Sequence, residues 1–168
     1  PEFEEVEKAC IAEEERLIGI KGTKSVDTIH KKLGNIMWDY VGMGRTKEGL
    51  EKALEELKKL RKEFDTDLFV PGTAGDGMNV ELDKAFRLKD FITMGELIAY
   101  DALNRNESCG GHFREEYQTE EGEAKRDDKN FFYVSCWNYQ GDDEKAPELI
   151  KEPLEYEAIK VQTRNYKS

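Results

Sequence analysis

Residues 46–65 read TKEGLEKALEELKKLRKEFD, and no other segment of the chain indicates its structure as clearly. Apolar side chains recur there every three or four residues, whereas lysines and glutamates occupy the positions between them. This period predicts an amphipathic helix that buries one face. Thr46 is suited to cap the helix, Glu48 lies favourably in its first turn, and we expect the helix to end near Asp65. The apolar positions are Leu50, Ala53, Leu54, Leu57, Leu60 and Phe64.

Two helices are expected before this one. The first is rich in glutamate and carries a loose apolar stripe that ends at Gly19 and Gly22. The second begins after Ser25, a favourable capping residue, and closes at Gly42 and Gly44. The first stripe consists of Phe3, Val6, Cys10 and Leu17, and the second of Val26, Ile29, Leu33, Ile36, Met37, Tyr40 and Val41.

A fourth helix is expected from Leu82 to Leu103, with Asn79 as its cap. Its apolar residues cover more than one face, which predicts a central helix that is packed on several sides and leaves one apolar flank for a partner. Beyond Gly111 the composition changes. Residues 130–139 and 155–162 are expected to form two strands. A turn over residues 141–147 and an extended tail over residues 163–168 complete the prediction.

Composition limits the classes of protein to consider. The chain has 168 residues, enough for one ordinary domain with a buried core. Its net charge of −11 argues against a nucleic-acid partner, because binding to phosphates requires lysine and arginine. No stretch approaches the ~18 consecutive apolar residues of a membrane span. Three cysteines without a CxxC pair indicate a reduced, cytosolic protein, and the opening at Pro1 leads us to expect part of a longer polypeptide.

Residues 105–116 read RNESCGGHFREE and carry the most informative polar pattern of the chain. We expect Gly110 and Gly111 to end the fourth helix through a left-handed turn. Cys109 and His112 have a spacing that suits a metal, but a metal site needs about four ligands, and His30 is the one other histidine. A nucleophilic Cys109 is disfavoured as well, because the carboxyl end of a helix does not stabilise a thiolate. We therefore assign no catalytic or metal-binding residue.

Two glycine-rich turns, residues 42–46 and 72–77, are the candidates for holding a phosphate group. A dinucleotide fingerprint needs a strand before the glycines and a helix packed directly after them. The first turn follows a helix, and the second carries Asp76 where an anion would bind. We therefore expect turns or helix caps here and assign no cofactor-binding residue.

The pattern Glu-Ser-x-Gly-x-His-x-Arg-x-Asp/Glu at residues 107–116 resembles a stretch near the C-terminus of the flavoprotein subunit of succinate dehydrogenases and fumarate reductases. Residues 34–45 (GNIMWDYVGMGR), followed by a leucine- and alanine-rich helix, resemble the helical start of the same C-terminal domain. The order of helices and β-rich tail is also similar, so the resemblance covers nearly the whole chain. Many members carry arginine where this chain has Cys109, so no role of that arginine is transferred. The cysteine form, with its insertion through Asp128, is similar to the branch found in anaerobic and related bacteria.

The resemblance implies the structural and interface domain of an enzyme that interconverts succinate and fumarate through FAD and passes electrons to an iron–sulfur subunit. The family's flavin- and substrate-binding residues lie upstream of this domain, so none is expected here. The implied partners are the flavin-binding domain of the same polypeptide and the iron–sulfur subunit, with a membrane anchor subunit reached only indirectly. The implied location is cytoplasmic, peripheral on the cytoplasmic face of the inner membrane. The C-terminal domain of an L-aspartate oxidase and a stand-alone helical interaction module are the alternatives.

We therefore expect a mainly α fold. Residues 1–111 should form an antiparallel bundle of three to four helices, similar to a spectrin repeat, and residues 112–168 an irregular and β-hairpin extension packed on that bundle. Ser108, His112 and Arg114 are expected to lie on a surface that forms hydrogen bonds with the flavin-binding domain. A helix end whose polar residues face water is the alternative for this segment.

Overall fold

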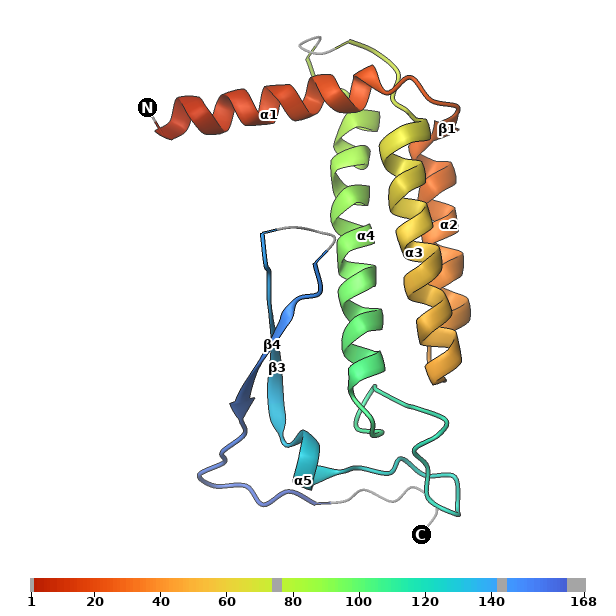
Figure 1. Ribbon diagram of the computed structural model, residues 1–168, viewed down its shortest axis with the longest axis vertical. Helices are drawn as coiled ribbons and strands as arrows, with labels where there is room; N and C mark the ends of the chain where they lie inside the picture. The colour runs from red at the N-terminus through yellow and green to blue at the C-terminus, as the bar shows by residue number, and fades with distance from the viewer. Residues whose placement is uncertain (1, 74–76, 142–144, 163–168) are drawn as a thin grey trace. The chain divides into compact units, whose positions relative to one another are not determined.

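The computed structural model describes residues 2–73, 77–141 and 145–162. The chain divides into two compact units, Pro1–Tyr100 and Asp101–Ser168. Figure 1 labels the helices and strands of both. Helices dominate the chain and the longer strands lie near its C-terminus, so the predicted mainly α class is confirmed. The packing of a C-terminal extension onto the bundle stays a prediction.

Helices α2 (Val26–Val41) and α3 (Lys47–Asp67) form a helical hairpin. Ser25 and Thr46 cap them as predicted, each accepting a hydrogen bond from an amide of the first turn, at 3.2 and 3.0 Å. The short connection makes the two helices antiparallel neighbours, as Figure 1 shows. The predicted stripe of α3 is confirmed except at Leu54, which is only partly buried. The buried side chains are Leu50, Ala53, Leu57, Leu60 and Phe64.

Helix α4 (Val80–Asn104) is the third member of the bundle. Asn79 caps it, with its Oδ1 accepting a hydrogen bond from an amide of the first turn at 3.1 Å. As predicted, α4 keeps one apolar flank exposed, which consists of Phe91, Met94 and Ile98. Its buried side carries Leu82, Ala85, Leu88, Ile92 and Ala99. In the part of the chain that the structure describes, no helix combines the length and apolarity that crossing a bilayer requires.

Side chains of α2 and α3 lie close to α4 at Gly95. A Cβ atom there would lie 3.1 Å from Met37 Sδ, 3.5 Å from Leu33 Cδ1 and 3.6 Å from Leu57 Cδ2. Side chains from α2 and α3 therefore occupy the space beside this glycine. The contact confirms that the stripes of α2 and α3 face α4.

Helix α1 (Glu2–Gly19) differs from the expectation of a packed stripe. Leu17 is its one fully buried side chain, whereas Phe3, Val6 and Cys10 are exposed. The reason is geometric, because α1 crosses the end of the bundle and extends beyond it, so that only its last turns meet the other helices (Figure 1).

An ion-pair cluster fixes the inner half of α1. Glu13 accepts hydrogen bonds from Arg16 and from Lys89 of α4, both at 2.7 Å, and Arg16 also reaches Asp65 of α3 at 3.2 Å. The hydrogen bond from Arg16 is the largest cause of a pKa of about 2 for Glu13, with partial burial opposing it and Lys89 adding to it. The strands β1 (Lys24–Ser25) and β2 (Leu68–Phe69) form a short parallel pair, which links the segment before α2 to the segment after α3.

The second unit contains the last turn of α4, the single turn α5 (Asp128–Phe131) and an antiparallel pair, β3 (Tyr133–Asn138) with β4 (Glu148–Pro153). The first predicted strand is confirmed over its central residues, although its first residues lie in α5. The second prediction, residues 155–162, is wrong, because the ladder pairs residues 148–153 instead. The predicted turn over 141–147 and the tail over 163–168 lie partly and wholly outside the described residues.

Candidate functional site: the polar segment after α4

The segment after α4 turns back on itself in a tight hairpin. The amide of Cys109 donates to the carbonyl oxygen of His112 at 2.8 Å, and the amide of His112 donates to that of Cys109 at 3.0 Å. Gly110 lies at the first central position with φ of +59°, where glycine is favoured in two-residue hairpin loops. The prediction that Gly110 and Gly111 end α4 is therefore wrong, because the helix already ends at Asn104.

Arg114 performs the capping that was predicted for the glycines. Its side chain is 1% exposed, and Nη1 donates to the carbonyl oxygens of Ala102 and Leu103 at 2.9 and 3.3 Å. These carbonyls belong to the last turn of α4, which has no further amides to bond. Nε donates to Glu116 at 3.1 Å, and the guanidinium lies 5.5 Å from the ring centroid of Tyr117.

Ser108 joins the two arms of the segment. Its hydroxyl accepts a hydrogen bond from the amide of Arg114 at 2.9 Å and donates to the carbonyl oxygen of the same residue at 3.1 Å. Its own amide donates to the carbonyl oxygen of Lys125 at 2.9 Å. Because Ser108 is fully buried, its hydroxyl acts inside the unit and holds the hairpin in register.

His112 lies at the base of the hairpin and is half-buried. Its Nε2 is 2.9 Å from the carbonyl oxygen of Arg105. A carbonyl can only accept, so Nε2 carries the proton in this arrangement. The bond fixes the imidazole ring against the backbone of the segment that follows α4.

Glu107 and Arg105 form a second group of buried hydrogen bonds, which was not predicted from the sequence. Glu107 is 2% exposed and accepts hydrogen bonds from Arg105 Nη1 and from the amide of Asp127, both at 2.8 Å. Arg105 also donates to the carbonyl oxygens of Phe131 and Tyr133 at 3.3 and 2.9 Å, and its guanidinium lies over both rings. The pattern of an arginine two residues before a glutamate was visible in the sequence, but its burial was not.

The polar side chains described above bond to one another and to the backbone of their own unit. Among the described residues, no buried side-chain nitrogen or oxygen lacks a hydrogen-bond partner. In the same part of the chain, no three histidine, cysteine, aspartate or glutamate side chains gather in a way that could hold a metal ion. We name residues 105–116 together with 125–133 the polar segment. Within it, Arg105 and Glu107 bond to its own backbone, and Arg114 bonds to the backbone of α4.

The two glycine-rich turns take part in helix ends. Arg45 Nε donates to the carbonyl oxygens of Val41 and Gly42, at 3.0 and 3.2 Å, and so closes α2. In the second turn, Asn79 Nδ2 donates to the carbonyl oxygen of Pro71 at 2.8 Å while its Oδ1 caps α4.

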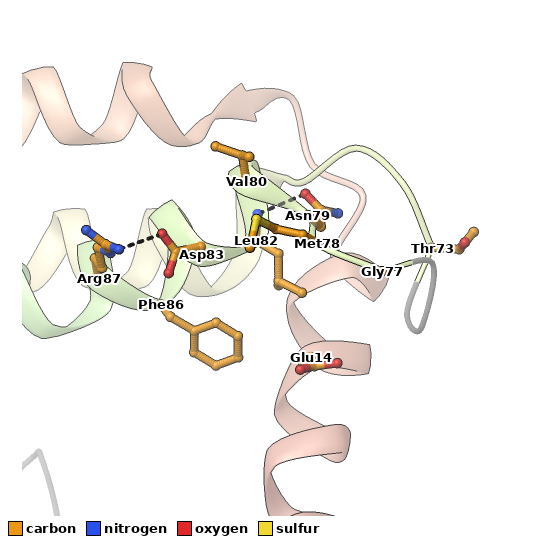
Figure 2. A pocket seen from close by; sticks show the side chains of 10 residues that line it. All are labelled: Glu14, Thr73, Gly77, Met78, Asn79, Val80, Leu82, Asp83, Phe86 and Arg87. Atoms are coloured by element: carbon orange, nitrogen blue, oxygen red, sulfur yellow. Dashed lines mark hydrogen bonds and ion pairs between the residues drawn. The ribbon is translucent and has the colours of Figure 1, made fainter.

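A hollow of about 650 Å³ lies in the first unit beside the start of α4 (Figure 2). Glu14 of α1 faces it, and Asp83 forms an ion pair with Arg87 at 2.9 Å on its other side. Met78 and Val80 supply exposed apolar lining. None of the residues predicted for the interface lines this hollow.

The first unit is thus a short antiparallel helical bundle, and the second unit carries a polar hairpin segment after α4. The family model described as the C-terminal domain of the fumarate reductase flavoprotein matches residues 30–166. The chain belongs to this family, whose members include the flavoprotein subunits of fumarate reductases and succinate dehydrogenases.

Two relatives illustrate the similarity. A fumarate reductase flavoprotein subunit of Proteus vulgaris is 29% identical over 148 residues, which are 87% of this chain and 22% of the relative. An uncharacterised FAD-dependent oxidoreductase of Methanocaldococcus jannaschii is 33% identical over 103 residues, which are 61% of this chain and 18% of the relative. The chain thus spans about a fifth of the length of the relatives it matches.

The alternative of an L-aspartate oxidase domain is not favoured. An L-aspartate oxidase of Nicotiana tabacum is 32% identical, but the similarity covers only 53% of this chain and 13% of the relative. The fold agrees with solved reductases. A quinol–fumarate reductase superposes with a TM-score of 0.73 at 23% identity over 89% of this chain and 24% of that one. Sdh1 of Mycobacterium smegmatis superposes with a TM-score of 0.67 at 24% identity, with the same coverage of both chains.

Proposed function

We propose that this chain is the C-terminal part of an FAD-dependent subunit that interconverts succinate and fumarate and passes electrons to an iron–sulfur subunit. The observation that carries the proposal is the family match over residues 30–166. The relatives support it, because the chain corresponds to only 22% of a fumarate reductase flavoprotein subunit. FAD and the substrate would then bind to the remaining part of the polypeptide, where FAD accepts or donates the two electrons.

The contribution of the described residues is to hold a surface in place. Arg114 secures the end of α4, Ser108 fixes the register of the hairpin, and Glu107 ties the hairpin to the loop before β3. Hydrogen bonds of this kind keep the hairpin in one conformation before any partner arrives, which lowers the entropy lost on docking. The polar segment therefore serves as a preorganised contact region.

The interface role of Ser108, His112 and Arg114 remains a proposal. Ser108 and Arg114 are buried and bonded inside the unit, which supports a role beneath the contact surface. His112 is half-buried and lies at the base of the hairpin, which supports a role at the surface itself. The surface that these three residues support would contact the flavin-binding domain.

The wider assembly is part of the same proposal. The subunit would lie on the cytoplasmic face of the inner membrane, bound to the iron–sulfur subunit and connected to a membrane anchor subunit only through it. Support comes from the similarity of the fold to that of a quinol–fumarate reductase with menaquinol.

The proposal is tested by comparing the 168-residue chain with the longer polypeptide that contains it. The visible absorbance after purification should show a bound flavin in the longer polypeptide. Calorimetry should show no micromolar binding of FAD by the 168-residue chain. A flavin spectrum that purifies with the 168-residue chain would overturn the assignment, as would a longer polypeptide without flavin.

A further inference from the structure

The outer half of α1 lacks support from the rest of its unit. The side chains from Glu2 to Ala12 are all exposed. Phe3 is 90% exposed and Val6 63%, although both are large and apolar. Figure 1 shows this half of α1 extending beyond the end of the bundle. An isolated helix of this length is marginal in water, so a surface that covers it would stabilise it.

Three exposed apolar side chains form one line along the helix, whereas the exposed Ile11 lies off it. Phe3, Val6 and Cys10 follow one another at spacings of three and four residues, so they share a face, and Leu17 lies on the same face where α1 meets the bundle. We call Phe3, Val6 and Cys10 the α1 stripe. Because ion pairs of Glu13 and Arg16 fix the inner half of α1, the stripe points in a set direction from the bundle.

We propose that the α1 stripe docks into an apolar groove edged by lysine and arginine side chains on the flavin-binding part of the same polypeptide, an inference that rests on the proposed function. The charge around the stripe determines the chemistry of the groove. Between residues 2 and 12 the charged side chains are Glu2, Glu4, Glu5, Glu7 and a single lysine, Lys8. In a dimer of this chain the carboxylates of the two copies would repel one another, whereas lysine and arginine side chains at the rim of a groove would attract them.

The size of the stripe indicates that the groove belongs to the same polypeptide. Eleven helical residues span roughly 16 Å, and one face of a helix is about 10 Å wide, which gives roughly 160 Å². A separate partner needs about 800 Å² on each side for a stable complex. A covalently connected partner needs far less, because the connection supplies an effective concentration in the millimolar range.

Cys10 allows a direct test, since it lies in the stripe and is exposed. The rate of its alkylation by a maleimide is measured by peptide mass spectrometry in the 168-residue chain and in the full-length polypeptide. The matched control is Lys8→Cys combined with Cys10→Ser, which places the thiol about 200° around the helix. We expect Cys10 to react at least tenfold more slowly in the full-length polypeptide, while the control thiol changes less than twofold. Phe3→Asp should restore the rate at Cys10.

Three results would overturn the docking proposal. Equal rates at Cys10 in both proteins would show that nothing covers the stripe. Protection that rises with the concentration of the 168-residue chain would identify a second copy as the occupant. Protection that requires added iron–sulfur subunit would identify that subunit instead. Flavin absorbance recorded on the same full-length sample tests the proposed function separately, so a colourless protein with a protected Cys10 would refute only the flavoprotein assignment.

Discussion

Replacing Arg114 with methionine should loosen the polar segment without disturbing the bundle. Methionine keeps most of the length and the apolar contacts of the arginine stem but has no donor for the end of α4. The carbonyl oxygens of Ala102 and Leu103 then lose the hydrogen bonds that Nη1 donates at 2.9 and 3.3 Å. The side chain is buried, so water does not replace these bonds without opening the segment.

The size of the effect follows from these contacts. A hydrogen bond from a charged donor contributes about 1.5–3 kcal/mol, and the longer bond to Leu103 contributes less than the shorter one. The pair with Glu116 adds about 0–1 kcal/mol, because that carboxylate is 39% exposed and regains water. We expect the free energy of local opening to fall by about 2–4 kcal/mol.

Native-state hydrogen exchange measures this opening. The amides of Ser108 and Arg114 bond to the carbonyl oxygen of Lys125 and to Ser108 Oγ, so both report on the segment. Their exchange should accelerate by roughly 30- to 1,000-fold, since each 1.4 kcal/mol is a factor of ten. Arg87→Met is the matched control, because Arg87 is 67% exposed and its pair with Asp83 contributes little. Unchanged exchange at both amides in Arg114→Met would refute the capping role of Arg114.

Two further predictions concern the first unit. Leu57→Asp places a carboxylate beside Gly95 and the side chains of α2, so the free energy of unfolding should fall by about 3–5 kcal/mol. Thermal melts measure this change, with the exposed Lys58→Asp as the control. A melt of Leu57→Asp that coincides with that of the wild type or of the control would contradict the packing described. The pKa of Glu13 is lowered to about 2, below its unfolded value, so its stabilisation is present above pH ~4.5 and is lost as pH falls toward 2. Unfolding free energies of the wild type and Glu13→Gln should therefore differ most above pH ~4.5 and converge toward pH 2, and a constant difference would show that Glu13 does not hold α1 through its charge.

Local signals in the sequence predicted the bundle well. The stripe of α3 and the caps at Ser25, Thr46 and Asn79 depend on residues within one or two turns. The structure confirms the three caps and the whole stripe except Leu54. The exposed flank of α4 followed from the same helical period. These features need no knowledge of the rest of the chain, because the helix itself determines which side chains share a face.

The errors occurred where distant residues decide the structure. Arg114 closes α4 from ten or more positions downstream, so the end of the helix could not be found from the nearby glycines. The strand partner of β3 was misplaced because apolar and polar residues alternate only weakly in both residues 148–153 and residues 155–162. Which of the two segments forms the strand depends on its pairing with β3. The stripe of α1 has a helical period but meets no partner inside its unit. Burial of Glu107 likewise depends on the amide of Asp127, twenty positions away.

The central claim, that the polar segment supports an interface rather than catalysis, is tested most directly by His112→Ala in the full-length enzyme. FAD content, retention of the iron–sulfur subunit and turnover per bound FAD are measured on the same preparation. We expect less bound FAD or less iron–sulfur subunit, with turnover per FAD and the apparent affinity for substrate almost unchanged. In the 168-residue chain the same substitution should change stability little. An enzyme that assembles and holds FAD normally but loses turnover would contradict the interface role and make His112 a catalytic residue.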